Sequence, residues 1–214
     1  TNSAHSTIVT GVRQLMLNGV EAWAPIRPRE PTIGECYRKF LNAPADKAVF
    51  VNGKPFVWTH PISTYPGYGN IWAPQIVYSR PTDNDLATWD STRAVIARSH
   101  PSFCYVLLGQ VDAVAHSGDT NGYISSIRQA DSLTFELWKL LRADPQYRDS
   151  TTLIITSDHG RHDERHGGWF SHGCSCHGCR HVLFLAIGPD IKADTIIGDR
   201  ADQTDIAPTV AGLL

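Results

Sequence analysis

Short apolar runs alternate along the chain with longer segments whose apolar residues recur at helical spacing. The runs stand at Ala48–Val51, Phe103–Leu108, Leu153–Thr156 and Val182–Ile187. A run of this length without regular polar alternation is typical of a strand that is covered on both faces. The four runs therefore predict four buried strands.

The segments between these runs predict helices. Thr32–Leu41 opens with a threonine that is followed three residues later by a glutamate, which is the pattern of a capping box. Asn84–Ser99 carries apolar residues near helical spacing and ends before Pro101. Tyr123–Leu141 has the clearest helical period of the chain. Alternating apolar strands and amphipathic helices predict an α/β layer fold with a mostly parallel sheet.

Two weaker patterns complete the picture. The stretch 52–82 is interrupted by proline and glycine and predicts irregular structure, with a short hairpin at Asn52-Gly53. Near the end of the sequence, Thr204 is placed to cap a last helix that begins at Asp205.

Composition and charge exclude several classes of protein. The 214 residues are 42% hydrophobic and 19% charged, which suits one globular domain with a sizeable core. The formal charge of −2 argues against a bulk electrostatic grip on nucleic acid, so no stable nucleic-acid complex is expected. The apolar runs are far shorter than the roughly 20 residues of a membrane span.

Candidate chemistry follows the predicted strands. Asp112 and His116 come after the second run, Asp158 and His159 come after the third, and His172 precedes the fourth. Ligands of parallel α/β sheets bind beyond the carboxyl ends of the strands. Carboxylate and imidazole together suit zinc, and less selectively manganese or iron. Two such groups could hold two ions for phosphoryl transfer, whereas taken singly these residues could be loop caps and surface histidines.

The cysteines are unevenly placed. Cys36 and Cys104 stand alone, while Cys174, Cys176 and Cys179 cluster among histidines. An odd number of cysteines does not form a complete disulfide framework, which leaves the redox compartment open. The cluster could close a tetrahedral structural zinc site with a histidine, form one disulfide, or carry free thiols. The nearby segment 162–166, with two histidines four apart, is interpreted as a solvated loop.

The ordered set of motifs resembles the alkaline phosphatase superfamily, specifically its type I phosphodiesterase/nucleotide pyrophosphatase branch, over nearly the whole chain. Asp112 and His116 match the D-x-x-x-H spacing of that family's first metal site. Ser157-Asp158-His159-Gly160 matches the S/T-D-H-G motif of its second site. His172-Gly173 fits the late histidine ligand best, and His177-Gly178 remains a rival.

The beginning and end of the sequence fit the same resemblance. Residues 1–11 align in register with the family's nucleophile segment, T-F-P-N-H-Y-T-L-V-T-G, which places Thr1 at the nucleophile. Asn18 falls near the asparagine that hydrogen-bonds the phosphoryl oxygen, and Ser3 and Ser6 are fallback nucleophiles. A threonine hydroxyl is a weak nucleophile and needs activation. The D-I-A-P-T segment at 205–209 resembles a helix near the family's carboxyl end.

The resemblance implies a three-layer α/β/α sandwich with a mostly parallel central sheet. It implies a two-metal hydrolase of phosphate esters, foremost a phosphodiesterase or nucleotide pyrophosphatase that acts through a covalent phospho-threonine. The expected cofactors are two divalent ions, zinc first, and the expected substrate is a small phosphate ester or nucleotide. A phosphomonoesterase or phosphonate hydrolase of the superfamily is the alternative. No arginine is placed by a motif to bind a dianionic monoester. This absence favours a phosphate diester as the substrate.

The resemblance also implies a missing part. The family's second metal site takes a further aspartate from a strand upstream of the nucleophile, so residues 1–214 are expected to be a single catalytic domain that is incomplete at its amino end. The resemblance favours a periplasmic or secreted location.

Two interpretations from other classes of protein remain as alternatives. A non-catalytic fragment or degenerate homologue could keep the Cys/His zinc site alone. An N-terminal threonine hydrolase would use Thr1 with its own amine, and it requires a strand at the start of the chain.

Overall fold

The computed structural model describes residues 2–14, 27–55 and 61–214. Thr1 and Asn18, the predicted nucleophile and phosphoryl-binding asparagine, lie outside the described residues. Contacts within the chain divide it into two compact units, Thr1–Gln110 with Ala201–Leu214 and Val111–Arg200. Each unit is described by itself.

The first unit is built on a three-stranded parallel sheet. β1 (Ala48–Asn52) lies between β2 (Gln75–Tyr78) and β3 (Phe103–Leu107), and all pairings are parallel. All five residues of β1 are buried. The strands predicted at 48–51 and 103–108 are therefore confirmed, and they are neighbours in the sheet.

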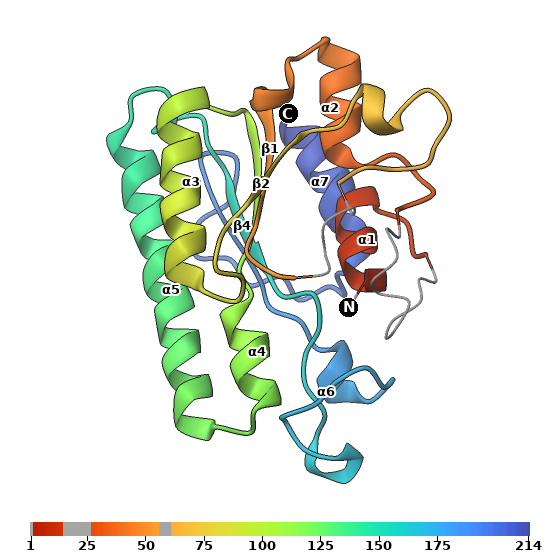
Figure 1. The fold of residues 1–214 in the computed structure, drawn as a ribbon, viewed down its shortest axis with the longest axis vertical. Helices are drawn as coiled ribbons and strands as arrows, with labels where there is room; N and C mark the ends of the chain where they lie inside the picture. Colours follow the sequence, from red (N-terminus) through yellow and green to blue (C-terminus); the bar gives the residue numbers. More distant parts are fainter. Residues whose placement is uncertain (1, 15–26, 56–60) are drawn as a thin grey trace. The chain divides into compact units, whose positions relative to one another are not determined.

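Helices cover both faces of this sheet. The group α1 (Asn2–Thr10), α2 (Ile33–Leu41) and α7 (Ile206–Leu213) lies on one side, and α3 (Asp85–Ser99) lies on the other (Figure 1). Successive side chains of a strand point to opposite faces, so Phe50 packs with the first group and Val49 and Val51 pack toward α3. The unit is thus a three-layer α/β/α arrangement, as predicted.

The helix starts follow the sequence closely, with one correction. Thr32 and Glu35 form the predicted capping box, because each side chain accepts a hydrogen bond from the other residue's backbone N–H. The predicted cap of the last helix was wrong. Asp202, and not Thr204, caps a short 3₁₀ turn that leads into α7, and its carboxylate accepts the N–H of Thr204.

The predicted hairpin at Asn52-Gly53 was also wrong. β1 pairs in parallel with β2, a strand that lies inside the stretch interpreted as irregular. The N–H of Gly53 donates to the carbonyl of Leu107 in the neighbouring strand. A Cβ on Gly53 would lie 2.2 Å from the hydroxyl of Thr88, so glycine is needed here for close approach to α3 and not for a turn.

The second unit contains three helices, a two-stranded sheet and a long connection. Its elements are α4 (Gln110–His116, whose first residue belongs to the first unit), α5 (Thr120–Ala143), β4 (Leu153–Thr156), the 3₁₀ turn η4 (Glu164–His166), α6 (His177–Arg180) and β5 (Phe184–Ile187). α5 confirms the helix predicted at 123–141 and extends it at both ends. No helix among the described residues is long and apolar enough to cross a membrane.

The last predicted strand differs from expectation. β5 pairs with β4 in an antiparallel direction, so the parallel arrangement holds for the first sheet only. Phe184, Leu185 and Ile187 are exposed, and the prediction of a buried strand at 182–187 was wrong. An apolar run reports the propensity to form a strand, and it cannot show whether another layer covers that strand.

Candidate functional site

The helix α4 brings Asp112 and His116 onto one face. Residues four apart on a helix lie one turn above each other. The Oδ1 atom of Asp112 lies 3.4 Å from Nε2 of His116. The start of this helix is held by Asp85, whose carboxylate accepts hydrogen bonds from the N–H groups of Gly109 and Gln110.

His172 completes a triangle with these two residues. Its Nε2 atom lies 3.5 Å from Oδ1 of Asp112 and 3.1 Å from Nε2 of His116. An ion with tetrahedral bonds of about 2.0–2.1 Å holds its ligand atoms about 3.4 Å apart. The three atoms are therefore spaced like the corners of one coordination polyhedron, and this donor set fits a divalent ion.

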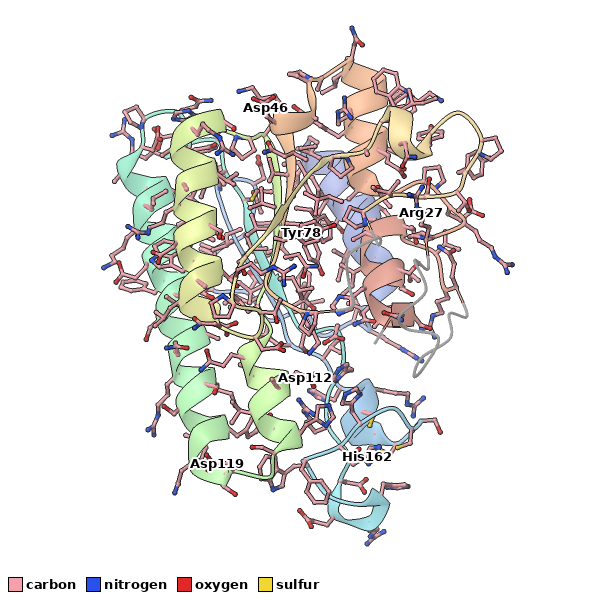
Figure 2. The ribbon with its side chains drawn as sticks, viewed as in Figure 1. Arg27, Asp46, Tyr78, Asp112, Asp119 and His162 are labelled. Atoms are coloured by element: carbon pink, nitrogen blue, oxygen red, sulfur yellow. The ribbon has the colours of Figure 1, made fainter. Side chains whose placement is uncertain are left out.

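Asp158 and His159 lie directly beside this triangle. They follow β4, and Nε2 of His159 lies 3.3 Å from Oδ2 of Asp158 and 3.9 Å from Oδ1 of Asp112. The ring of His159 stacks on that of His172 with centroids 3.6 Å apart. The structure thus brings all five predicted metal-ligating side chains together within the second unit; Figure 2 labels Asp112, on α4.

Two of the imidazoles are held in the form that a metal requires. Burial lowers the pKa of His159, and burial together with the neighbouring His159 lowers the pKa of His172 to about 4. Both rings are therefore neutral near pH 7. A neutral imidazole offers a lone pair to a metal without first losing a proton.

Arg161 belongs to the same site, and the sequence did not single it out. Its Nη2 atom lies 2.5 Å from Oδ1 of Asp112 and 3.3 Å from the backbone carbonyl of that residue. The side chain is 13% exposed, and Nη1 is buried without a hydrogen-bond partner among the described residues. The sequence feature that could have identified Arg161 is its position directly after Ser157-Asp158-His159-Gly160.

The competing candidates lie elsewhere or lack access. His177 is exposed at the start of α6 and its ring neighbours that of His181, so the structure places His172, and not His177, beside Asp112. Ser6 is fully buried in α1, which does not suit a fallback nucleophile. The described chain opens with a helix from Asn2, whereas the N-terminal threonine hydrolase required a strand.

Comparisons with known proteins agree on the kind of chemistry. A protein-family model described as "Metalloenzyme superfamily" matches residues 70–214, more than half of the chain. A 2,3-bisphosphoglycerate-independent phosphoglycerate mutase of Gracilaria tenuistipitata var. liui is 27% identical over 58% of this chain and 23% of its own length. A phosphopentomutase of Pseudothermotoga lettingae is 25% identical over 64% of this chain and 33% of its own length.

A second phosphopentomutase, of Herpetosiphon aurantiacus, is 29% identical over 45% of this chain and 21% of its own length. The chain therefore spans a third or less of the length of these relatives. No solved structure matches the chain. The expected superfamily is supported, but the phosphodiesterase/nucleotide pyrophosphatase branch is not confirmed, because these relatives are phosphomutases. The chain belongs to the metalloenzyme superfamily.

Proposed function

We propose that this chain carries a reaction centre for metal-dependent phosphoryl transfer. The observation that carries the proposal is the triangle of Asp112, His116 and His172 at 3.1–3.5 Å, with Asp158 and His159 beside it. The triangle would hold one divalent ion, and the second pair would supply two ligands to another. The mixed oxygen and nitrogen donors suit zinc, with manganese as the main competitor.

The chain's own residues divide the reaction between them. Divalent ions at this centre would stabilise negative charge on the attacking and leaving oxygens. Thr1, which the family resemblance identifies as the nucleophile, would attack phosphorus through its hydroxyl oxygen and form a phospho-threonine as the bond to the leaving oxygen breaks. The leaving oxygen would take up a proton, and a second acceptor would later remove the phosphoryl group from Thr1. Asn18 would donate a hydrogen bond to a phosphoryl oxygen.

Arg161 favours a phosphate monoester as the substrate. The preference for diesters rested on the lack of a placed arginine, and Arg161 removes that argument. A guanidinium binds the oxygens of a phosphate dianion through charge-assisted hydrogen bonds. The Nη1 atom has no hydrogen-bond partner among the described residues, and because it is buried a substrate phosphate would contact it only after the side chain moves. A phosphodiesterase or nucleotide pyrophosphatase is therefore the second candidate for the substrate class.

The final acceptor distinguishes a hydrolase from a mutase. Water as the acceptor gives free phosphate, and a hydroxyl of the same substrate gives an isomer. The mutase outcome is favoured by the printed names of the relatives, all of which are mutases. The hydrolase outcome follows from the family that the motifs resemble. Both use the same covalent step at Thr1.

The test compares para-nitrophenyl phosphate with bis-para-nitrophenyl phosphate, before and after chelation. Activity should disappear on chelation and return with zinc or manganese, and the monoester should be cleaved faster. Release of inorganic phosphate, measured with sugar phosphates and phosphoglycerate, separates hydrolysis from isomerisation. Turnover that withstands chelation would contradict the proposal, and faster cleavage of the diester would restore the phosphodiesterase reading.

A further inference from the structure

A second cluster of metal-ligating side chains lies in the long connection between β4 and β5. The Sγ atoms of Cys174 and Cys179 are 3.8 Å apart, and the ligand atoms of His162, Cys174 and Cys179 all lie within 4.8 Å of one another. Zinc–thiolate bonds of about 2.3 Å place two sulfurs of one tetrahedral ion about 3.8 Å apart. A disulfide would instead join them at about 2.05 Å.

His162 is the second observation that points to a metal. Both of its ring nitrogens are buried without a hydrogen-bond partner among the described residues. Buried polar side-chain atoms are normally hydrogen-bonded, and leaving one unsatisfied is unfavourable. A bound ion would take the lone pair of one nitrogen. Figure 2 shows His162 in the connection beside α6, the helix that carries Cys179.

The turn around the cysteines is arranged to support thiolates. The N–H of Cys176 donates to Sγ of Cys174 at 3.3 Å, and the N–H of Cys179 donates to Sγ of Cys176 at 3.4 Å. Hydrogen bonds to sulfur favour its charged form, which is the form that binds metal. Cys176 lies in the same turn, but its Sγ is not within 4.8 Å of all three ligand atoms of His162, Cys174 and Cys179, so its side chain must turn to supply a fourth ligand.

We propose that His162, Cys174 and Cys179, completed by Cys176, form a structural zinc site. Three thiolates and one imidazole are a common donor set of closed, tetrahedral zinc sites. The sulfur donors also distinguish this cluster from the oxygen and nitrogen donors around Asp112, because soft ligands select zinc over manganese or magnesium.

The site would fix the backbone that carries the other candidate metal ligands. The N–H of Gly160, next to His159, donates to the carbonyl of Cys179 at 2.9 Å. The N–H of His162 donates to the carbonyl of Ser171, next to His172, at 3.0 Å. A Cβ on Gly160 would lie 1.9 Å from the carbonyl oxygen of Gly178, so the two segments touch at the backbone. An ion between them would hold both segments together without taking part in chemistry.

A neighbouring group offers a weaker alternative. Ligand atoms of Asp163, His166 and Cys176 also lie within 4.8 Å of one another. Asp163 and His166 are exposed and bind each other, with Oδ1 and Nδ1 at 2.5 Å. Their donors are already satisfied and open to water, whereas those of His162 are buried and unsatisfied. We therefore assign the ion to His162 and the cysteines.

The test uses the full chain loaded with cobalt(II) in place of zinc. Thiolate-bound cobalt gives an intense ultraviolet charge-transfer band, which carboxylate and imidazole ligands do not give. The band should appear in the wild-type protein and disappear in Cys179→Ser. It should persist in Cys36→Ser, a control thiol in the first unit, and in Asp112→Asn, which alters only the other centre. Release of zinc from the unmodified wild-type protein by a mercurial reagent gives a second readout that needs no variant.

Three results would overturn the assignment. The first is a wild-type protein without a thiolate band and without mercurial-releasable zinc. The second is a disulfide between Cys174 and Cys179 in protein purified without oxidant. The third is a band that survives Cys179→Ser and is lost in Cys176→Ser, which would place the ion with Asp163 and His166. None of these measurements uses activity, so they test the zinc site independently of the proposed phosphoryl transfer.

Discussion

Asp112 is the residue around which the candidate site is organised. Its Oδ1 atom faces the imidazoles of His116 and His172 and the guanidinium of Arg161, all within 3.5 Å. An ion bound by this carboxylate would compete with Arg161 for Oδ1, and a guanidinium displaced by the ion could then contact a substrate phosphate. The role of Arg161 in binding the substrate phosphate is therefore the first property to test at the scale of single residues.

Replacing Arg161 by Lys should impair cleavage of a monoester more than cleavage of a diester. The lysine keeps the charge but loses the planar pair of donors that suits phosphate. A lost hydrogen bond to a charged group costs about 1.5–3 kcal/mol, which corresponds to roughly a 10- to 100-fold fall in kcat/KM. Steady-state kinetics on both para-nitrophenyl substrates measures the difference. An equal loss on the two substrates would contradict the role in recognising a dianion.

Asp85 gives a prediction for the pH dependence of stability. Burial raises the pKa of its carboxyl, although Gly109 and Gln110 donate to it, and Oδ2 is buried without a partner among the described residues. Because the folded-state pKa lies above the unfolded value, this group adds stability below the unfolded pKa of about 3.9, and that stability is lost as the pH rises through the folded pKa.

The comparison of wild type with Asp85→Asn isolates this contribution. The amide keeps the oxygen that accepts from the backbone but carries no charge. The free energy of unfolding of the wild type, minus that of the variant, should fall as the pH rises from about 3.9 and then level off. Denaturant unfolding over a pH series measures the difference, and a difference that increases with pH would show that the pKa is lowered instead.

At the scale of elements, the connection between β4 and β5 depends on close backbone contact. Gly160→Ala would place a Cβ 1.9 Å from the carbonyl oxygen of Gly178 and 2.5 Å from that of His181. We expect a loss of stability on the order of 1–3 kcal/mol and weaker metal binding, because overpacking displaces the backbone next to His159. Gly198→Ala is the matched control, since no atom lies within 4 Å of its added Cβ. Thermal unfolding and metal titration measure both variants. Equal losses of stability and of metal affinity in the two variants would contradict the role of this contact.

The elements that could be predicted are those whose signals are local. Thr32 and Asn84 begin helices through side-chain hydrogen bonds to nearby N–H groups, so the sequence alone places those starts. β2 and α4 escaped prediction because they span only 75–78 and 110–116 and depend on neighbours distant in sequence. The antiparallel direction of β5 and its exposed face are likewise set by pairing and covering layers, which an apolar run does not encode.

The same division applies to the site. Their places beside the predicted strands, together with the family resemblance, identified Asp112, His116, Asp158, His159 and His172 as candidates. The contact of Arg161 with Asp112 depends on how 161–181 folds back, which no local pattern shows. The choice of His172 over His177 depends on that fold too, since His177 begins α6 and points to His181. Their roles as ligands remain predictions.

At the scale of the whole molecule, the described residues place all five candidate ligands in one unit, Val111–Arg200. The predicted nucleophile, Thr1, belongs to the other unit and lies outside the described residues. Binding of metal can therefore be tested within the second unit's own residues, independently of the nucleophile. The proposed phosphoryl transfer through Thr1 would require both units, and the organisation of residues 1–214 as one catalytic domain stays a prediction.

The most direct test of the central claim is the metal content of the purified full chain, determined by elemental analysis for the wild type, His172→Ala and His177→Ala. We predict that His172→Ala loses the ion held with Asp112 and His116, while His177→Ala keeps the wild-type content. Unchanged circular dichroism of both variants would show that the fold is intact. Metal content that is unaffected by His172→Ala, or that is lost equally in His177→Ala, would contradict the assignment of this site as the metal centre.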